Sequence, residues 1–293
     1  MSAHVAQGAI AASAVTASTT AARPRLRVVY AWELRKLQAQ KRTYIGFGCA
    51  LLVPLIFIVS LLADDSGPTG VPFGDYVRES GLAIPLVGLY FGAFWFFPLV
   101  TALVAGDIVA NEDNHGTLKT ILTRSVERWQ VFVAKALAAF TYAFAALAIF
   151  VGSGLVIGGM LWGFDPLVSL SGSVISLERS LLLVGGTTLV YFVPTLAVAS
   201  IALLLSTLTR NSAAAVVATL MASLIMQLLG MVSALDAIEP YLLPEQFNAW
   251  QGLLRDPIDW APVIRAVWVS ALFALPGLFW GFAAFIRRDV TGG

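Results

Sequence analysis

The sequence predicts an all-α integral membrane protein with six transmembrane helices, and three observations support this fold class. Hydrophobic residues make up 58% of the 293-residue chain and charged residues only 12%, whereas a soluble domain is about half apolar and a quarter charged. Six long stretches carry no charged side chain. The Lys and Arg residues between them fall mostly in alternate connections. Six spans and their connections would use nearly the whole length, which leaves no room for a separate catalytic domain.

The region before the first apolar stretch has two predicted parts. Residues 1–22 consist mostly of Ala, Ser, Thr and Gly, a composition that predicts a disordered tail. A cleaved signal peptide is not expected, because the basic cluster follows this tail and the apolar stretch after it is too long. Residues 23–43 are predicted to form a basic amphipathic helix at the membrane interface, with Trp32 among the headgroups and Glu33 interrupting the apolar face. A solvated linker is the alternative.

Each uncharged stretch is long enough to cross a bilayer as an α-helix. About 20 helical residues span the roughly 30 Å hydrocarbon core, and an ionisable side chain at its centre costs about 3 kcal/mol. Strands are excluded because the stretches are too long and do not alternate. A six-helix domain is therefore predicted over residues 44–288, with spans at about 44–63, 82–105, 136–161, 180–206, 212–234 and 264–286.

The basic residues in the connections predict the orientation of these spans. Membrane proteins keep an excess of Lys and Arg on the cytoplasmic side. If the N-terminus lies in the cytoplasm, the external connections contain only Arg78, Arg179, Arg255 and Arg265, and every other Lys and Arg lies inside. Both ends are therefore predicted to be cytoplasmic, including a short C-terminus at residues 289–293.

The connection at residues 106–135, between the second and third predicted spans, is the longest cytoplasmic one. Leu118, Ile121 and Leu122 recur in it at helical spacing, so a short helix with a small apolar face is expected. Acidic residues precede this helix, and basic residues lie along it and after it. A surface helix of this kind suits docking into the groove of a partner, and an ordinary solvated connection is the alternative.

An ordered pattern runs through this connection: an acidic residue, Gly-Thr-Leu, a helical turn, a basic residue, and a Lys that opens the next span. The residues that carry it are Glu112, Gly116, Thr117, Leu118, Arg124 or Arg128, and Lys135. The pattern resembles the coupling loop of type-two ATP-binding-cassette (ABC) permeases. Ser125 departs from the Pro that is common in that family, which leaves the end of the helix open. The resemblance extends from Arg25 to the Arg-Arg-Asp ending at residues 287–289.

The resemblance implies a subunit of an ABC exporter in the plasma membrane of a bacterium. Two six-span permeases, identical or homologous, would lie together in the lipid bilayer and rest their coupling loops on separate cytoplasmic ABC ATPases. ATP and Mg would bind in those partner chains, because this sequence has no Gly-x-x-x-x-Gly-Lys-Ser/Thr phosphate loop. No catalytic residue, cofactor, metal or nucleic acid partner is expected here. The residues implied to couple to the ATPase are Glu112, Gly116, Thr117, Leu118, Lys119, Ile121, Leu122, Arg124 and Arg128.

The last external connection, residues 236–264, is rich in Pro and is too long for a simple turn. It is expected to fold back on the membrane as a re-entrant segment between spans five and six. In the resembling family this region forms two short re-entrant helices at the outer end of the pathway. The residues implied to face lipid or close that pathway are Leu242, Leu243, Phe247, Trp250, Leu253 and Leu254. Interfacial anchoring by Trp is an equal alternative.

The absence of ionisable residues from the predicted spans favours an apolar or amphipathic cargo, such as a drug, lipid or peptide. Polar side chains in the spans could hydrogen-bond a cargo, although bonding to a neighbouring helix is the preferred interpretation of each. These candidates for a cargo path are Tyr90, Trp95, Tyr142, Thr187, Tyr191, Thr195 and Gln227. Small-residue pairs such as Gly154 and Gly158 are interpreted as helix-packing sites.

Three other classes of multi-pass membrane protein are alternatives to an exporter, and the sequence argues against two of them. An intramembrane serine protease lacks a base, because the histidines are His4 in the tail and His115 in the loop, far from Ser153. A secondary transporter would place coupling carboxylates inside its spans, and none is found there. A membrane sensor or assembly factor that transports nothing remains the alternative, because hydropathy does not distinguish a moving bundle from a static one. No residue selects one cargo.

Overall fold

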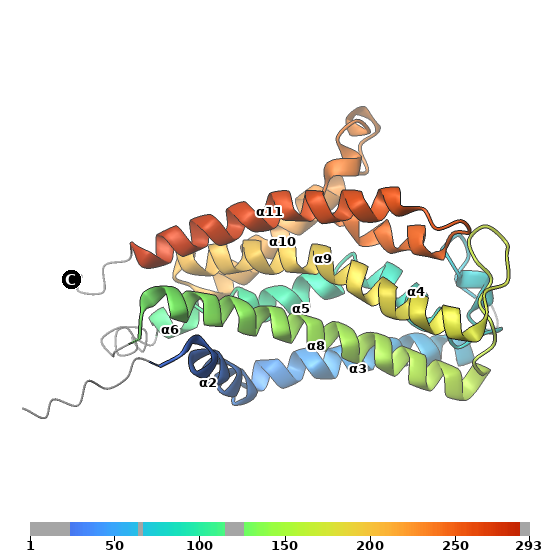
Figure 1. The fold of residues 1–293 in the computed structure, drawn as a ribbon, viewed down its shortest axis with the longest axis horizontal. Coiled ribbons are helices and arrows are strands. Elements are labelled where there is room, and N and C mark those ends of the chain that lie inside the picture. Colours follow the sequence, from blue (N-terminus) through green and yellow to red (C-terminus); the bar gives the residue numbers. More distant parts are fainter. Residues whose placement is uncertain (1–23, 64–66, 115–125, 288–293) are drawn as a thin grey trace, which may run out of the picture.

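The computed structural model describes residues 24–63, 67–114 and 126–287, which form a helical bundle elongated along one axis (Figure 1). Apart from an isolated bridge between Val168 and Val174, these ranges contain no strand pairing. The all-α prediction is therefore confirmed for the described ranges. The α-helices are α2 (Leu26–Gln38), α3 (Lys41–Ala63), α4 (Ala83–Gly92), α5 (Phe96–Ala105), α6 (Ala110–Asn114), α8 (Arg128–Trp162), α9 (Leu177–Thr209), α10 (Ser212–Leu229) and α11 (Trp260–Ile286), and the 3-10 helices are η1 (Gly74–Tyr76), η2 (Ser233–Leu235), η3 (Glu239–Tyr241) and η4 (Pro244–Leu254).

Five of the described helices are long and apolar enough to cross a membrane, namely α3, α8, α9, α10 and α11. Their surfaces carry many exposed Leu, Ile, Val, Phe and Trp side chains, which only an apolar surrounding would accommodate on this scale. The chain is therefore a multi-pass helical membrane protein. Helices α4 and α5 pass the same test only as a bent pair.

The predicted second span, residues 82–105, is not one continuous helix, and whether the two pieces form one span stays a prediction. Helix α4 ends at Gly92, and the chain bends by 66° before it continues through α5. Pro98 explains why the helix does not continue through the bend. It has no N–H to donate to the carbonyl of Phe94, and its ring would clash with that carbonyl. As the third residue of α5, Pro98 occupies the first turn, where a missing N–H is tolerated.

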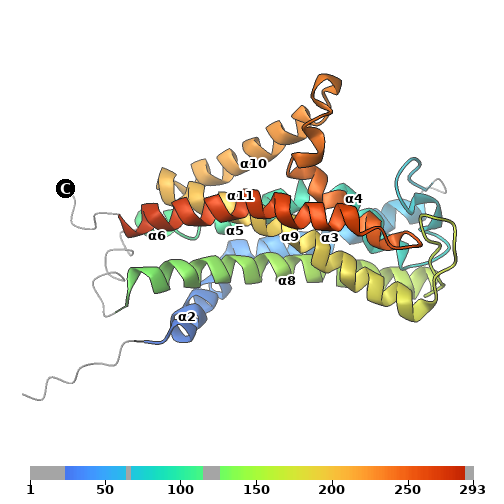
Figure 2. The ribbon, with the colours of Figure 1, turned by 45° about the horizontal axis from the view of Figure 1, so that its top comes forward.

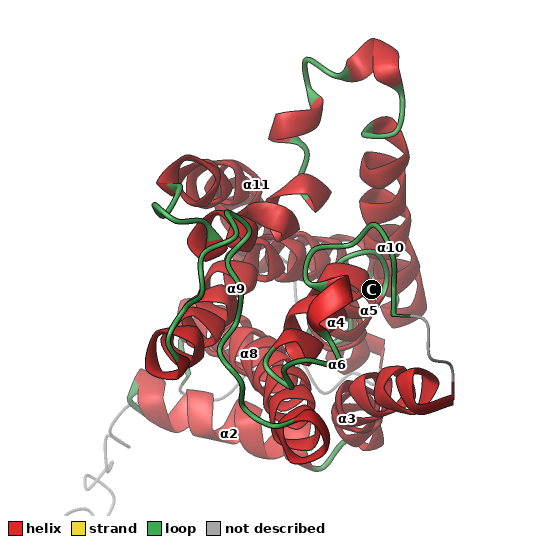
Figure 3. Ribbon diagram, turned by 90° about the vertical axis from the view of Figure 1, so that its right-hand side faces the viewer, coloured by secondary structure: helices red, strands yellow, loops and turns green. Residues whose placement is uncertain are grey.

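Helix α2 crosses one end of the bundle and packs against α8 (Figure 3). It is shorter than the predicted interfacial segment 23–43, because α3 already begins at Lys41. Its buried residues are Val29, Glu33 and Leu37, which recur every four positions and so share one face. Glu33 lies on the apolar face as its spacing predicts, but it is buried against the bundle instead of weakening a contact with lipid.

The remaining predicted spans match described helices but differ at their ends. Helix α8 begins at Arg128, well before the predicted start at residue 136, and therefore includes Lys135. Helix α10 ends at Leu229, before the predicted end at residue 234. The predicted spans begin and end at charged residues. The first turns of α8 instead continue through Lys135, whose charge is paired with carboxylates inside the protein. Figure 2 shows α10 diverging from the rest of the bundle.

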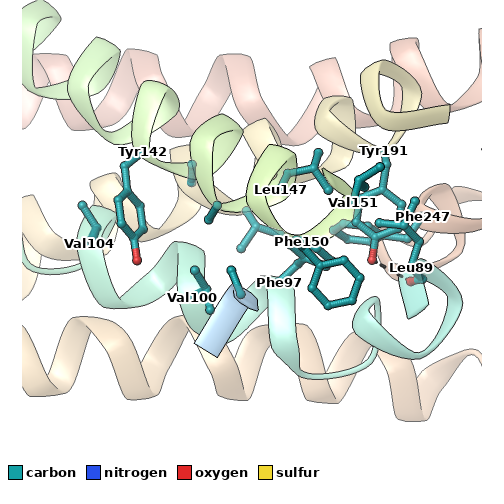
Figure 4. Close-up of a cluster of buried hydrophobic side chains, with 14 of the residues drawn as sticks. Leu89, Phe97, Val100, Val104, Tyr142, Leu147, Phe150, Val151, Tyr191 and Phe247 are labelled. Atoms are coloured by element: carbon teal, nitrogen blue, oxygen red, sulfur yellow. Dashed lines mark hydrogen bonds between the residues drawn. The ribbon is translucent and has the colours of Figure 1, made fainter. Parts of the chain in front are cut away.

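Aromatic side chains fill the centre of the bundle (Figure 4). The ring centroids of Phe97 and Phe150 are 5.1 Å apart, those of Phe97 and Tyr191 are 4.9 Å apart, and those of Tyr191 and Phe247 are 4.9 Å apart. The Tyr191 hydroxyl donates a hydrogen bond of 3.0 Å to the carbonyl of Leu89. This cluster fixes the bent α4–α5 pair against α8, α9 and η4, with the polar end of Tyr191 satisfied.

The predicted re-entrant segment contributes to this core. Helix η4 packs against α9 and α11, and Leu243, Phe247, Leu253 and Leu254 are buried in the protein, whereas Leu242 is partly exposed. Trp250 is 0% exposed, so interfacial anchoring by this residue is ruled out. The chain between α10 and η3 projects away from the bundle (Figures 1 and 2).

Gly158→Ala is expected to lower the free energy of unfolding by about 1–3 kcal/mol, the usual effect of overpacking a tight contact. A Cβ atom there would lie 2.8 Å from the carbonyl oxygen of Gly81 and 2.8 Å from Cγ1 of Ile84. Gly152 on the same helix has no neighbour within 4 Å, so Gly152→Ala should be neutral or up to about 1 kcal/mol more stable. Thermal unfolding of both variants in detergent measures the difference, and equal stabilities would contradict the packing interpretation.

Candidate functional site

Four ionised side chains form a compact cluster where α2, α6 and α8 meet. The Lys135 Nζ lies 3.0 Å from Glu33 Oε2 and 2.7 Å from Glu112 Oε2. The Lys36 Nζ lies 2.5 Å from Glu33 Oε1 and 2.7 Å from Glu112 Oε1. Each carboxylate therefore bridges both ammonium groups, and the two negative charges balance the two positive ones.

The cluster is largely shielded from solvent. The side chain of Lys135 is 0% exposed, that of Glu33 is 4% exposed and that of Glu112 is 13% exposed, whereas that of Lys36 is 38% exposed. Lys135 also donates a 3.0 Å hydrogen bond to the carbonyl of Ile108. Partial burial of Lys36 lowers its pKa, but the Glu33 and Glu112 carboxylates more than offset this and hold that pKa above its ordinary value. Lys36 therefore stays protonated at neutral pH.

Asp107 anchors a second group of contacts next to this cluster. Its buried carboxylate pairs with Arg42 at the start of α3 and accepts a hydrogen bond from Ser212 at the start of α10. The Ser206 hydroxyl of α9 accepts the backbone N–H groups of Val109, at 3.3 Å, and Ala110, at 3.0 Å. Residues 106–114 are therefore attached to α2, α3, α8, α9 and α10 through specific polar contacts.

Two residues implied to couple to an ATPase lie within the described ranges, and both bind other parts of this chain. Glu112 belongs to the cluster, and Arg128 donates a 2.8 Å hydrogen bond to the carbonyl of Ile286 at the end of α11, where a basic group is favourable. Their contacts with an ATPase stay predictions. The other implied residues lie outside the described ranges: Gly116, Thr117, Leu118, Lys119, Ile121, Leu122 and Arg124.

The candidates for a cargo path do not form one site. Thr187, Tyr191 and Thr195 are buried in α9, and the Thr195 hydroxyl donates a 3.0 Å hydrogen bond to the carbonyl of Tyr191 in its own helix. Tyr142 is buried in α8 and stacks on Phe47, with ring centroids 5.0 Å apart. The remaining three candidates lie elsewhere: Tyr90 is partly exposed at the end of α4, Trp95 is 55% exposed in the bend, and Gln227 lines a cavity beside α10.

Tyr191 supports the preferred interpretation of these residues, because its hydroxyl bonds to the neighbouring helix α4. Sequence reasoning missed the clustered charges instead. Glu33 shares its face of α2 with Val29 and Leu37, and Lys135 directly precedes an apolar stretch. A carboxylate on an apolar helix face and a Lys at the edge of a span need partners of opposite charge when they are buried. The sequence could therefore have indicated that Glu33 and Lys135 pair.

The fold and the cluster define the chain as a multi-pass helical membrane protein whose buried ion pairs gather at one end of the bundle. The chain belongs to the family described as "Protein of unknown function (DUF2705)", whose model matches residues 49–291. It is similar to the Bacillus subtilis (strain 168) protein named "Uncharacterized protein YhcI", with 27% identity over 237 residues that cover 76% of this chain and 71% of the relative. Neither description names an activity.

Proposed function

We propose that this chain is the permease subunit of an ABC exporter for an apolar or amphipathic cargo. The observation that carries the proposal is the buried cluster of Glu33, Lys36, Glu112 and Lys135. It fixes the base of the connection that contains Gly-Thr-Leu, at the bundle end where α2 and the end of α11 also lie (Figure 2). The proposal places this end in the cytoplasm, next to a separate ATPase that binds ATP and Mg.

The proposed topology has six spans, with both ends inside. Helices α3, α8, α9, α10 and α11 supply five spans, and the bent pair of α4 and α5 supplies the sixth. A bend inside a span needs alternative partners for its freed backbone groups, and the protein core around Phe97 and Tyr191 encloses this one. The segment with η4 then lies at the outer side as the re-entrant cap.

The cluster supports coupling because it makes the flanks of the connection rigid. Glu112 precedes the connection and is attached to α2 and α8, while Arg128 follows it and is attached to α11. A movement that an ATPase imposes on the connection between these residues would be transmitted to α2, α8 and α11 through these charged hydrogen bonds. Coupling through packed, hydrogen-bonded elements is how separated sites influence each other.

A second permease would pack beside the first, and α10 supports this part of the proposal. The buried residues of α10 are Ala215 and Thr219 alone, and Val217, Met221, Ile225 and Leu228 are exposed along it. Lipid or the helix of another subunit would cover such a surface. An identical and a homologous partner fit equally well.

Affinity purification of the tagged chain from bacterial membranes tests the proposed function. We expect a phosphate-loop ATPase to co-purify in stoichiometric amount and the complex to hydrolyse ATP in nanodiscs, because the sequence contains no phosphate-loop motif of its own. A neighbouring reading frame with the phosphate-loop motif is the inexpensive companion observation. Recovery of the chain without any nucleotide-hydrolysing partner would contradict an exporter and favour a membrane sensor or assembly factor.

A further inference from the structure

A cavity of about 160 Å³ lies between the α4–α5 bend, the end of α10 and the segment with η3 and η4. None of the four residues of the ion-pair cluster lines this cavity. Its lining combines apolar, amide and acidic side chains. The lining residues used below are Phe94, Met226, Gln227, Glu239, Glu245 and Asn248.

The polar side of this cavity is acidic. Glu239 and Glu245 line it, and no Lys or Arg does. Within the described ranges, neither carboxylate has an ion-pair partner within 4.0 Å. The Asn248 amide donates a 3.3 Å hydrogen bond to Glu245 Oε2, and Arg265 lines a neighbouring cavity that Glu245 also lines. The cavity therefore favours a positive charge.

The opposite side of the cavity is apolar and aromatic. Phe94 leaves the α4–α5 bend with 37% of its surface exposed, and Met226 lies beside it on α10. A smaller, almost wholly apolar cavity shares Phe94 and Met226 and extends to Phe247 in the core. Aromatic faces and thioethers next to carboxylates are the surroundings in which proteins bind alkylated ammonium groups.

From this lining we infer that the cavity binds a lipophilic organic cation, with an alkylated ammonium group between Glu239 and Glu245 and an apolar substituent against Phe94 and Met226. Binding itself does not depend on the proposed function, whereas the assignment of such cations as the exported cargo rests on it. No ionisable residue in the predicted spans pointed to a charged cargo, because both carboxylates lie in the connection after α10.

Acidification is expected to weaken the binding. Burial raises the pKa of the Glu245 carboxyl, the neighbouring Glu239 raises it further, and Asn248 and Arg265 act in the opposite direction. A proton and an organic cation therefore compete for Glu245, so affinity should fall as the pH drops through that raised pKa. Titrating the wild type with phenyltrimethylammonium at several pH values measures this trend, and an affinity that rises on acidification would contradict it.

The direct test measures binding of phenyltrimethylammonium to the full-length chain in nanodiscs by equilibrium dialysis, with no ATPase present. Glu245→Gln should weaken binding about tenfold or more, because the ammonium group would lose a charge-assisted contact. Asp236→Asn is the matched control, since Asp236 is exposed in the same connection and does not line the cavity. Benzenesulfonate should not bind. Equal affinities of the wild type and a Glu239→Gln/Glu245→Gln double variant would overturn the inference.

A second measurement covers the case in which Glu245→Gln does not fold. Met231 lines the cavity and is 70% exposed, so Met231→Cys in a Cys49→Ala background gives a single reactive thiol. A cationic methanethiosulfonate should label it faster than an anionic one, and phenyltrimethylammonium should slow that labelling. Absence of protection would overturn the inference. If binding holds but no ATPase co-purifies, the site stands and the exporter fails; if an ATPase co-purifies but nothing binds, the exporter stands and the site fails.

Discussion

Lys135→Met is expected to lower the free energy of unfolding by about 3–5 kcal/mol, the usual effect of removing one partner from a buried ion pair. The substitution keeps the length and apolar stem of the side chain. It leaves the carboxylates of Glu33 and Glu112 facing each other, with Lys36 as their remaining partner within the cluster. Thermal or denaturant unfolding in detergent, followed by circular dichroism, measures the loss.

Two further variants separate this explanation from a general effect of removing a Lys. Lys41→Met removes an exposed Lys at the start of α3 and should change stability by less than about 0.5 kcal/mol. Lys135→Met/Glu33→Gln leaves one positive and one negative charge in the cluster and should recover part of the loss. If Lys135→Met were as stable as Lys41→Met, the cluster would not hold α2 to the bundle.

If the proposed function is correct, Leu118→Asp is expected to abolish cargo-stimulated ATP hydrolysis by the complex of this chain with its ATPase. Leu118 lies outside the described ranges, and the expectation comes from its helical spacing with Ile121 and Leu122. A carboxylate on the apolar docking face would have to be buried without a partner in the ATPase groove. The measurement compares ATPase rates of wild-type and variant complexes in nanodiscs, with and without cargo.

Thr120→Asp is the matched control for that experiment, because position 120 lies on the opposite side of the predicted helix from Leu118. It adds the same charge to the same connection and should leave stimulation intact. Both variants should reach the membrane in wild-type amounts, since no span is changed. Unchanged stimulation in Leu118→Asp would show that this face does not dock on the ATPase.

The helical membrane fold could be predicted because long uncharged stretches have few other stable solutions. The bend after Gly92 was harder to predict, because membrane helices often contain Pro without being interrupted, as α9 does at Pro194. Helix α8 begins before the predicted span start at residue 136, because the position of a charged residue alone set that predicted boundary. Lys135 remains inside a helix because Glu33 and Glu112 surround it, and their proximity depends on tertiary structure.

The candidate site was only partly predictable for a related reason. Glu112 was singled out from the pattern around Gly-Thr-Leu, but its bond to Lys36 joins residues that are 76 positions apart. The acidic cavity could not be predicted from the residues of the spans. Glu239 and Glu245 follow α10 in the sequence, and they line one cavity with Phe94 because of the bend between α4 and α5. The periodicity of a sequence identifies the apolar face of a single helix. The ion-pair cluster and the acidic cavity are each formed by side chains from several helices, so periodicity does not predict them.

The order in which the chain is synthesised gives Lys36 a second role. Glu33 emerges 102 residues before Lys135, which at about 5–20 residues per second corresponds to about 5–20 s on the ribosome. During that interval Lys36, three residues away from Glu33, is a partner that is already present. Glu33 therefore has a cationic neighbour throughout the interval before α8, which contains Lys135, is synthesised. Assembly of this end of the protein then needs no step in which the Glu33 carboxylate lacks a cationic partner.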